Sequence, residues 1–172
     1  KKILLIISGS IAAVKSYDLI RALKNKDYEV TCVLSEGGKQ FVTALACSGL
    51  TGTKTYSELF SITDEVEMGH IALSRASDLV LVAPASANIM AKMAQGICDD
   101  LASTLLLATD KKIMIAPAMN VKMWEHAATQ RNVKQLMKDG IIIIPPADGE
   151  LACGEVGSGR MAEVEDILRT VE

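Results

Sequence analysis

The stretch that decides the fold is Lys112-Ile113-Met114-Ile115-Ala116-Pro117-Ala118-Met119-Asn120. An apolar, β-branched run that stops at a proline is typical of a buried parallel strand that opens into a loop. In open α/β sheets, ligands bind beyond the carboxyl ends of the strands. The amide of Asn120 can both donate and accept hydrogen bonds, which suits the recognition of a carboxylate. Taken alone, the four residues after Ala116 could also be an ordinary turn.

Apolar runs recur along the chain and alternate with segments of helical periodicity. Strands are predicted at Ile3–Ser8, Tyr28–Leu34, Asp78–Ala83, Lys112–Ala116 and Ile141–Ile144, with a weaker one at Leu50–Thr55. Helices are predicted at Ile11–Lys24, Lys39–Ala46, Ala87–Met93, Asp99–Ala108, Ala127–Lys138 and Ala162–Thr170. Strands separated by helices imply right-handed crossovers and a parallel sheet covered on both faces. The sequence therefore predicts one doubly wound α/β domain over residues 1–172, with a six-stranded parallel sheet.

The composition argues against several classes of function. Aromatic residues make up only 3% of the chain and its formal net charge is −3, so neither stacking platforms nor a basic face for nucleic acid are expected. No apolar run approaches the roughly 18 residues of a membrane helix, so no membrane partner is expected. The four cysteines show no zinc spacing, and no metal site is expected. Cys32 and Cys98 are predicted to be core thiols, and a reducing cytoplasm is the expected setting.

Small polar residues follow three of the predicted strands. Gly9 and Ser10 lie in the first turn, Ser35 follows the second strand, and Ser86, Ala87 and Asn88 follow the strand that ends at Ala83. The first turn is neither GxGxxG nor a P-loop, yet its glycine and serine precede a helix N-terminus, which favours phosphate. Each of these residues could also be a simple helix cap. Their shared position at one edge of the sheet favours a site for a mononucleotide phosphate and its polyol chain.

Two further residues are chemically capable of catalysis. His70 has a side chain that titrates near neutral pH, so it could act as a base or orient a substrate, although a lone histidine is more often structural. Cys153 lies in Leu151–Met161, where closely spaced glycines predict a mobile or sharply turned loop and an accessible thiol. The same loop could be a plain connection. The acidic residues at positions 64, 65 and 67 are expected to form a solvated loop.

These motifs, in this order, resemble those of the flavin-containing cysteine decarboxylase family. They are Gly9-Ser10-Ile11-Ala12-Ala13, His70-Ile71, Pro84-Ala85-Ser86-Ala87-Asn88 with Gly96 and Asp99-Asp100-Leu101, Pro117-Ala118-Met119-Asn120 with Trp124, and Ala152-Cys153-Gly154 with Gly159-Arg160-Met161. The resemblance runs from Gly9 to Met161. Gly37-Gly38 replaces bulkier residues, and Ile89 replaces a common threonine, which puts the detail of the phosphate contacts in doubt.

The resemblance implies a three-layer, Rossmann-like fold, bound FMN, and homo-oligomers built from trimers that can reach a dodecamer, with the sites near subunit contacts. It also implies FMN-dependent decarboxylation of 4′-phospho-N-pantothenoylcysteine to 4′-phosphopantetheine in coenzyme A biosynthesis. By the same resemblance, the chain would be either a separate decarboxylase or one half of a longer protein whose other half ligates cysteine to phosphopantothenate.

The resemblance also implies roles for individual residues. His70 would activate and position the substrate, and Cys153 would deliver a proton in the final reduction. Asn120, with Met119 and Ala118 beside it, would bind the substrate carboxylate. The residues expected to hold FMN are Gly9, Ser10, Ile11, Ser35, Ser86, Ala87 and Asn88.

Two other functions stay open at this point. One is an oxidative decarboxylase of peptidyl-cysteine of the lantibiotic type, which would stop at the oxidised ene-thiol. The presence of Cys153 argues against it, because the final reduction is the step that needs this thiol. The other is a non-catalytic, FMN-binding regulatory subunit, but the long acidic tail typical of such subunits is not present in this sequence.

Overall fold

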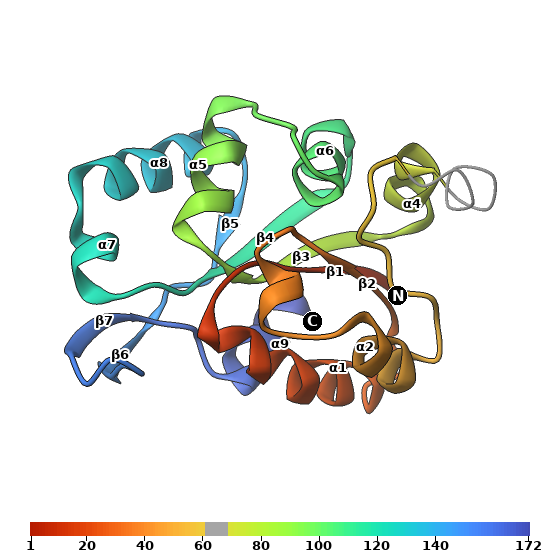
Figure 1. Cartoon of the computed structure of the whole chain (residues 1–172), viewed down its shortest axis with the longest axis horizontal. Helices are drawn as coiled ribbons and strands as arrows, with labels where there is room; N and C mark the ends of the chain where they lie inside the picture. The colour runs from red at the N-terminus through yellow and green to blue at the C-terminus, as the bar shows by residue number, and fades with distance from the viewer. Residues whose placement is uncertain (61–68) are drawn as a thin grey trace.

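The computed structural model describes residues 1–60 and 69–172. Its centre is a parallel sheet of five strands in the order β2-β1-β3-β4-β5 (Figure 1). The strands are β1 (Lys2–Ile7), β2 (Glu29–Leu34), β3 (Leu79–Ala85), β4 (Lys112–Pro117) and β5 (Ile142–Ile143). In the register of the central strands, Ile3 of β1 pairs with Val30 of β2 and with Leu79 of β3.

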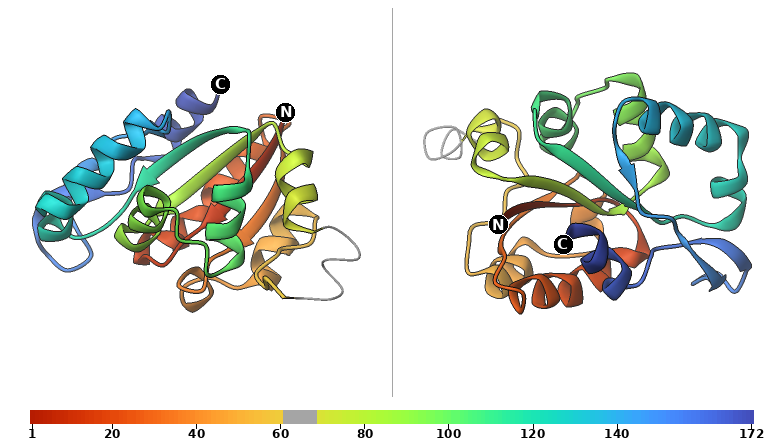
Figure 2. Two further views of the ribbon diagram at one scale, coloured as in Figure 1. Left: turned by 90° about the horizontal axis from the view of Figure 1, so that it is seen from above. Right: turned by 180° about the vertical axis from the view of Figure 1, so that it is seen from behind.

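Helices cover both faces of this sheet (Figures 1 and 2). One layer contains α1 (Ser16–Lys24), α2 (Ala44–Thr51) and α9 (Val164–Val171). The other contains α4 (His70–Ala76), α5 (Ala87–Gln95), α6 (Leu101–Ala108) and α8 (Ala127–Lys138). Alternate residues of β1 pack into opposite layers, Leu5 into the first and Leu4 into the second, and both are buried. Burial on both faces explains the unbroken apolar runs of the strands. The predicted α/β class and its two helical layers are confirmed.

The predicted strand at Leu50–Thr55 is wrong, which is why the described part of the sheet has five strands and not six. Thr43 caps the N-terminus of α2 by accepting a hydrogen bond from the Ala46 amide at 3.1 Å. The helix then continues to Thr51 and ends at Gly52, whose φ of +76° is typical of a helix C-cap. On the side of β2 away from β1, the described residues contribute an isolated bridge between Tyr56 and Val33. Gly52 therefore ends a helix and does not weaken a strand.

A small hairpin lies at one end of the molecule, beside the short helix α7 (Val121–Glu125) (Figure 1). Its antiparallel strands are β6 (Ala147–Glu150) and β7 (Val156–Arg160). The glycine-rich segment expected to be a loop is therefore a turn followed by a strand. Two short 3-10 helices, η1 (Ile11–Lys15) and η2 (Gly38–Gln40), follow β1 and β2. They start the connections at the carboxyl edge of the sheet.

Within residues 1–60 and 69–172, no helix combines the length and apolar content needed to cross a membrane. The acidic positions 64, 65 and 67 lie outside the described residues. The prediction that Cys98 is a core thiol is wrong, because its side chain is exposed. The reason is Gly96, which ends α5 with a φ of +71° and leaves Cys98 in the connection to α6.

Candidate active site

The carboxyl ends of β1 and β3 meet at the point where the strand order changes direction. Connections from β1 and β3 leave toward opposite faces there, and such switch points form the ligand crevice of doubly wound sheets. Ser8 fixes this point: its buried hydroxyl donates to the Pro84 carbonyl at 2.7 Å and accepts from the Ser86 amide at 2.8 Å. Ser8 therefore holds the turn after β1 and the start of α5 in a fixed relation.

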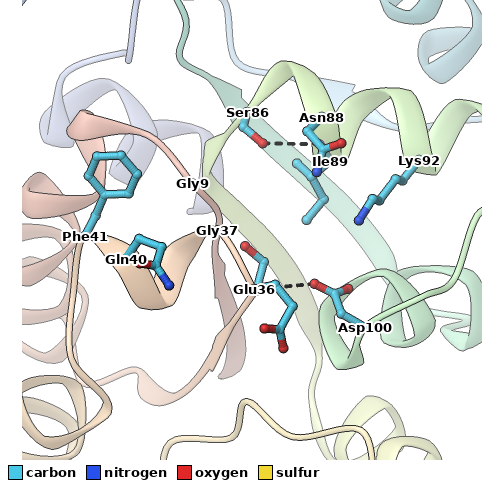
Figure 3. Close-up of a pocket in the computed structure, with 11 residues that line it drawn as sticks. Gly9, Glu36, Gly37, Gln40, Phe41, Ser86, Asn88, Ile89, Lys92 and Asp100 are labelled. Atoms are coloured by element: carbon cyan, nitrogen blue, oxygen red, sulfur yellow. Dashed lines mark hydrogen bonds between the residues drawn. The ribbon is translucent and has the colours of Figure 1, made fainter.

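A cavity of about 260 Å³ opens beside this switch point, and we call it the serine cavity (Figure 3). It is lined by Gly9, Ser35, Glu36, Gly37, Gln40, Phe41, Ser86, Asn88, Ile89, Lys92 and Asp100. Ser86 is the N-cap of α5 and its hydroxyl accepts from the Ile89 amide at 3.2 Å. Ser35 accepts from the Gly38 amide at 3.0 Å. Ser86 thus caps α5, Ser35 fixes the turn after β2, and both serines line the cavity.

The turns after β1 and β2 touch through their glycines. A Cβ atom on Gly9 would lie 2.9 Å from the Gly37 Cα, closer than real Cβ contacts come. A Cβ on Gly38 would meet the carbonyl oxygen of Ile7. The pair Gly37-Gly38 therefore has a local reason: the two turns approach too closely for side chains.

Asp100 forms the acidic wall of the serine cavity opposite α5 (Figure 3). It caps α6, accepting from the Ser103 amide at 2.8 Å and the Ser103 hydroxyl at 2.6 Å, and it also accepts from the Glu36 amide at 3.1 Å. Burial raises the pKa of this carboxyl, but the hydrogen bonds from Ser103 and Glu36 and the charge of Lys92 outweigh burial and lower its pKa below the usual 3.8. Asp100 is therefore a structural anion that ties the β2 turn to α6.

A larger cavity of about 550 Å³ contains the Pro-Ala-Met-Asn segment, and we call it the asparagine cavity. It is lined by Gly9, Ser10, Ile11, Ala12, Val14, Lys15, Ala118, Met119, Asn120, Met123, Glu150, Leu151, Ala152, Cys153, Gly159, Arg160 and Met161. Gly9 lines both cavities, so they meet at the turn after β1. The structure thus brings the first turn, the Asn120 segment and the Cys153 turn, which are far apart in sequence, to one place.

Asn120 is held in a defined orientation. It is the N-cap of α7, and its Oδ1 accepts from the Met123 amide at 2.8 Å. The acceptor half of its amide is therefore used within the chain, and the Nδ2 amino group is left as a donor. Because a carboxylate only accepts hydrogen bonds, this is the half of the amide that could bind one.

The hairpin packs directly onto the Asn120 segment. The Met119 amide donates to the Gly159 carbonyl at 2.9 Å. Gly159 has a φ of +136°, and a Cβ there would come within 3.0 Å of the Met119 carbonyl oxygen, a separation that real Cβ atoms essentially never show. A Cβ on Gly157 would lie 3.1 Å from Val121. Glycines in β7 are therefore needed for the close approach that joins the two motifs.

Cys153 lies in the turn between β6 and β7, and its side chain is exposed, as expected. The turn is closed by hydrogen bonds from the Leu151 amide to Glu155 at 2.8 Å and from the Gly154 amide to Leu151 at 2.9 Å. By contrast Cys32 is fully buried, and contact with the Cys47 thiol together with burial raises the pKa of its thiol. Within the described residues, Cys153 is the thiol that lines the asparagine cavity.

Two residues predicted for the site line neither cavity. Ala87 packs against the core behind Ser86. His70 is the first residue of α4 and is half-buried. In Figures 1 and 2, α4 and the β6–β7 hairpin lie at opposite ends of the molecule, so a single chain does not bring His70 to Cys153. Ser10 and Ile11 line the asparagine cavity and not the serine cavity.

Sequence reasoning left several lining residues out of the site. Asp100 carries a recognisable signal, because Asp100 and Ser103 have the spacing of a capping box. Arg160 was part of a motif and Lys15 of a predicted helix, but neither had a role assigned. Ser8 has no sequence signal that separates it from any serine at the end of a strand. Within the described residues, no group of three or more His, Cys, Asp or Glu side chains could hold a metal ion.

Comparisons with known proteins show which proteins this chain is similar to. The Coenzyme A biosynthesis bifunctional protein of Vibrio vulnificus (strain YJ016) is 45% identical over 172 residues, which are 100% of this chain and 43% of that protein. The chain thus spans less than half the length of the curated relatives it matches first. A PPC decarboxylase mutant solved in complex with pantothenoylaminoethenethiol has 35% identity and a TM-score of 0.87, covering 99% of this chain and 95% of that one.

A second solved structure, the FMN-binding protein AtHal3, has 35% identity and a TM-score of 0.85, covering 99% of this chain and 94% of that one. The sequence model of the Flavoprotein family matches residues 1–172. This chain belongs to the flavoprotein family.

Proposed function

We propose that this chain catalyses the FMN-dependent decarboxylation of 4′-phospho-N-pantothenoylcysteine to 4′-phosphopantetheine. The observation that carries the proposal is the asparagine cavity, in which an amide donor on Asn120 and the exposed thiol of Cys153 lie beside the turn that follows β1. The likeness to PPC decarboxylase and to the bifunctional coenzyme A proteins supports the same activity.

The serine cavity fits a flavin mononucleotide by the chemistry of its donors. Gly9, Ser35, Ser86 and Asn88 offer backbone amides, hydroxyls and a side-chain amide at helix N-termini, a donor set suited to a phosphate and a polyol. A Cβ atom on Gly9 or Gly37 would press against the other glycine, so only bare backbone fits where the two turns meet. Ser10 and Ile11 would contact the cofactor from the adjoining cavity, with Ala87 behind Ser86. When bound, FMN supplies the reversible oxidation of the thiol-bearing carbon, an electron sink that side chains lack.

Asn120 would bind the carboxylate that is lost. Its Nδ2 group donates a hydrogen bond without bringing a positive charge, so the carboxylate is oriented but only weakly stabilised in the ground state. An enzyme gains rate only from interactions that are stronger in the transition state than in the bound substrate. A neutral amide therefore suits CO2 release better than an ion pair would. Ala118 and Met119, both buried, form the floor under this group.

Cys153 would donate the proton from its Sγ to the substrate carbon in the final reduction. It lies at the exposed turn of a hairpin whose strands are joined to the body through Gly159 and Met119. A thiol is a much stronger acid than a hydroxyl, which makes it the better donor. The cysteine-to-serine form of the PPC decarboxylase was solved with an aminoethenethiol, which supports a role for a cysteine after CO2 loss.

His70 would act in the site of a neighbouring protomer. Because α4 and the hairpin lie at opposite ends of one chain, His70 and Cys153 can serve the same substrate only if two copies contribute. A trimer provides three equivalent sites of this kind, and four trimers would make a dodecamer.

Co-expression of His70→Asn and Cys153→Ser chains tests whether sites are shared, because mixed trimers contain sites in which both residues are intact. Activity well above that of either variant is expected; no gain would contradict shared sites.

We further propose that residues 1–172 form a single domain, that it is fused in the full-length protein to a ligase of phosphopantothenate and cysteine, and that it works in the cytoplasm. The relatives' greater length and the name of the bifunctional protein support the fusion.

The decisive experiment incubates the purified chain, loaded with FMN, with 4′-phospho-N-pantothenoylcysteine and weighs the product. Loss of the mass of CO2 with no net oxidation is expected. A product that is lighter by two further hydrogens would favour the oxidative type of cysteine decarboxylase. No CO2 release would contradict the proposal.

A further inference from the structure

Arg160, the last residue of β7, lines the asparagine cavity together with Asn120 and Cys153. Its Nη2 lies 2.9 Å from Oε1 of Glu163, which precedes α9. The guanidinium also lies over Gly149 of β6, where a Cβ would be 3.5 Å from the Arg160 Cζ. The guanidinium therefore forms an ion pair within the chain and lies close to the backbone of Gly149.

The Nε atom of Arg160 is buried and has no hydrogen-bond partner within residues 1–60 and 69–172. Nearly all buried donors in native structures are satisfied, and an exception calls for an acceptor that the chain does not supply. Because Arg160 lines the asparagine cavity, a bound substrate is the natural source of that acceptor.

The substrate carboxylate is a poor candidate for this acceptor. A charged donor would stabilise the carboxylate most strongly before CO2 leaves, and this would raise the barrier to decarboxylation. The 4′-phosphate is also a poor candidate, because Glu163 already balances the charge of Arg160 and Glu150 lines the same cavity. Lys15 lines this cavity too and has no ion pair among the described residues, so it is the better partner for a dianion.

We infer that Arg160 is a substrate-binding residue, which donates its Nε–H to an amide carbonyl of the acyl arm on the cysteinyl nitrogen. This rests on the proposed function. The arm takes no part in bond breaking, so the interaction is equally strong in the ground state and in the transition state. Such uniform binding lowers KM and leaves kcat nearly unchanged.

The test compares Arg160→Met with wild type on two substrates, 4′-phospho-N-pantothenoylcysteine and its dephosphorylated form. A hydrogen bond from a charged donor corresponds to a loss of about 10- to 100-fold in affinity. We expect KM to rise by that factor on both substrates, because both carry the same arm. Calorimetry with 4′-phosphopantetheine, which keeps the arm but lacks the carboxylate, should show the same factor in Kd. Arg160→Lys should show the same rise in KM. A lysine ammonium group cannot pair with Glu163 and at the same time offer a second donor from a planar group.

Arg21→Met is the matched control. Arg21 forms the same type of pair, 3.0 Å from Asp18 three residues away, but it lines neither cavity. It should leave KM unchanged, and its decarboxylase activity tests the proposed function independently of Arg160. A rise in KM confined to the phosphorylated substrate would overturn the inference, since Arg160 would then recognise the phosphate. An unchanged KM and Kd, or a fall in kcat alone, would overturn it as well.

Discussion

Replacement of Gly159 by alanine should loosen the joint between the hairpin and the Asn120 segment. The backbone φ of +136° is one that L residues rarely adopt, and strain of this kind costs about 1–3 kcal/mol. The new Cβ would also press on the Met119 carbonyl oxygen and disturb the hydrogen bond from the Met119 amide to Gly159, worth about 0.5–1.5 kcal/mol. Together these effects predict a loss of about 2–4 kcal/mol in the free energy of unfolding.

Equilibrium unfolding in urea measures this loss, and Gly154→Ala is its matched control. Gly154 lies in the same hairpin with a φ of +83°, but a Cβ there would meet nothing within 4 Å. The control should therefore lose only the cost of the left-handed conformation, about 1–2 kcal/mol. Gly159→Ala should also lower decarboxylase activity, because the joint positions Cys153 relative to Asn120. If the Gly159→Ala protein is no less stable than the Gly154→Ala protein, the close approach of Gly159 to Met119 does not hold the hairpin in place.

Further outcomes are expected for variants at three positions and for the bound cofactor. Cys153→Ser should release CO2 but accumulate an ene-thiol two hydrogens lighter than phosphopantetheine, as mass spectrometry would show. His70→Asn should keep FMN but release no CO2. If Cys153→Ser forms phosphopantetheine at the wild-type rate, the thiol has no role in the reaction. Asp100→Asn should destabilise the protein by about 1–3 kcal/mol at neutral pH. Because the folded pKa of Asp100 lies below the usual 3.8, its stabilising contribution is present above pH 3.8 and is lost as the pH falls through the folded pKa, so the two proteins should converge in acid unfolding curves. The purified protein should be yellow with about one FMN per chain, and a colourless protein that does not take up added FMN would contradict the cofactor assignment.

Much of the site could be predicted because it lies at strand ends. Apolar runs locate the strands, and parallel connections place all their carboxyl ends at one edge of the sheet. This is enough to bring Ser35, Ser86 and Asn120 to the same edge without knowledge of any contact. The resemblance added His70 and Cys153, whose roles no local pattern could assign.

The errors have equally local causes. The strand expected at Leu50–Thr55 rested on residue type alone, whereas the caps at Thr43 and Gly52 decide for a helix. Cys98 was expected in the core because the pattern did not reveal that Gly96 ends α5 and leaves Cys98 in an exposed connection. In both cases hydrogen bonding at a helix end outweighed weak hydrophobic periodicity.

The sequence by itself determined the alternation of strands and helices, the two buried faces of the sheet and the edge at which polar residues gather, because these follow from hydrophobic period and chain connectivity. Only the tertiary structure decided that the Asn120 and Cys153 motifs meet, that Arg160 joins them, and that His70 lies at the other end of the molecule. Those relations depend on close approach between segments far apart in the chain, such as Gly159 against Met119. Side-chain volume and backbone hydrogen bonds across such contacts have no signature in the local sequence.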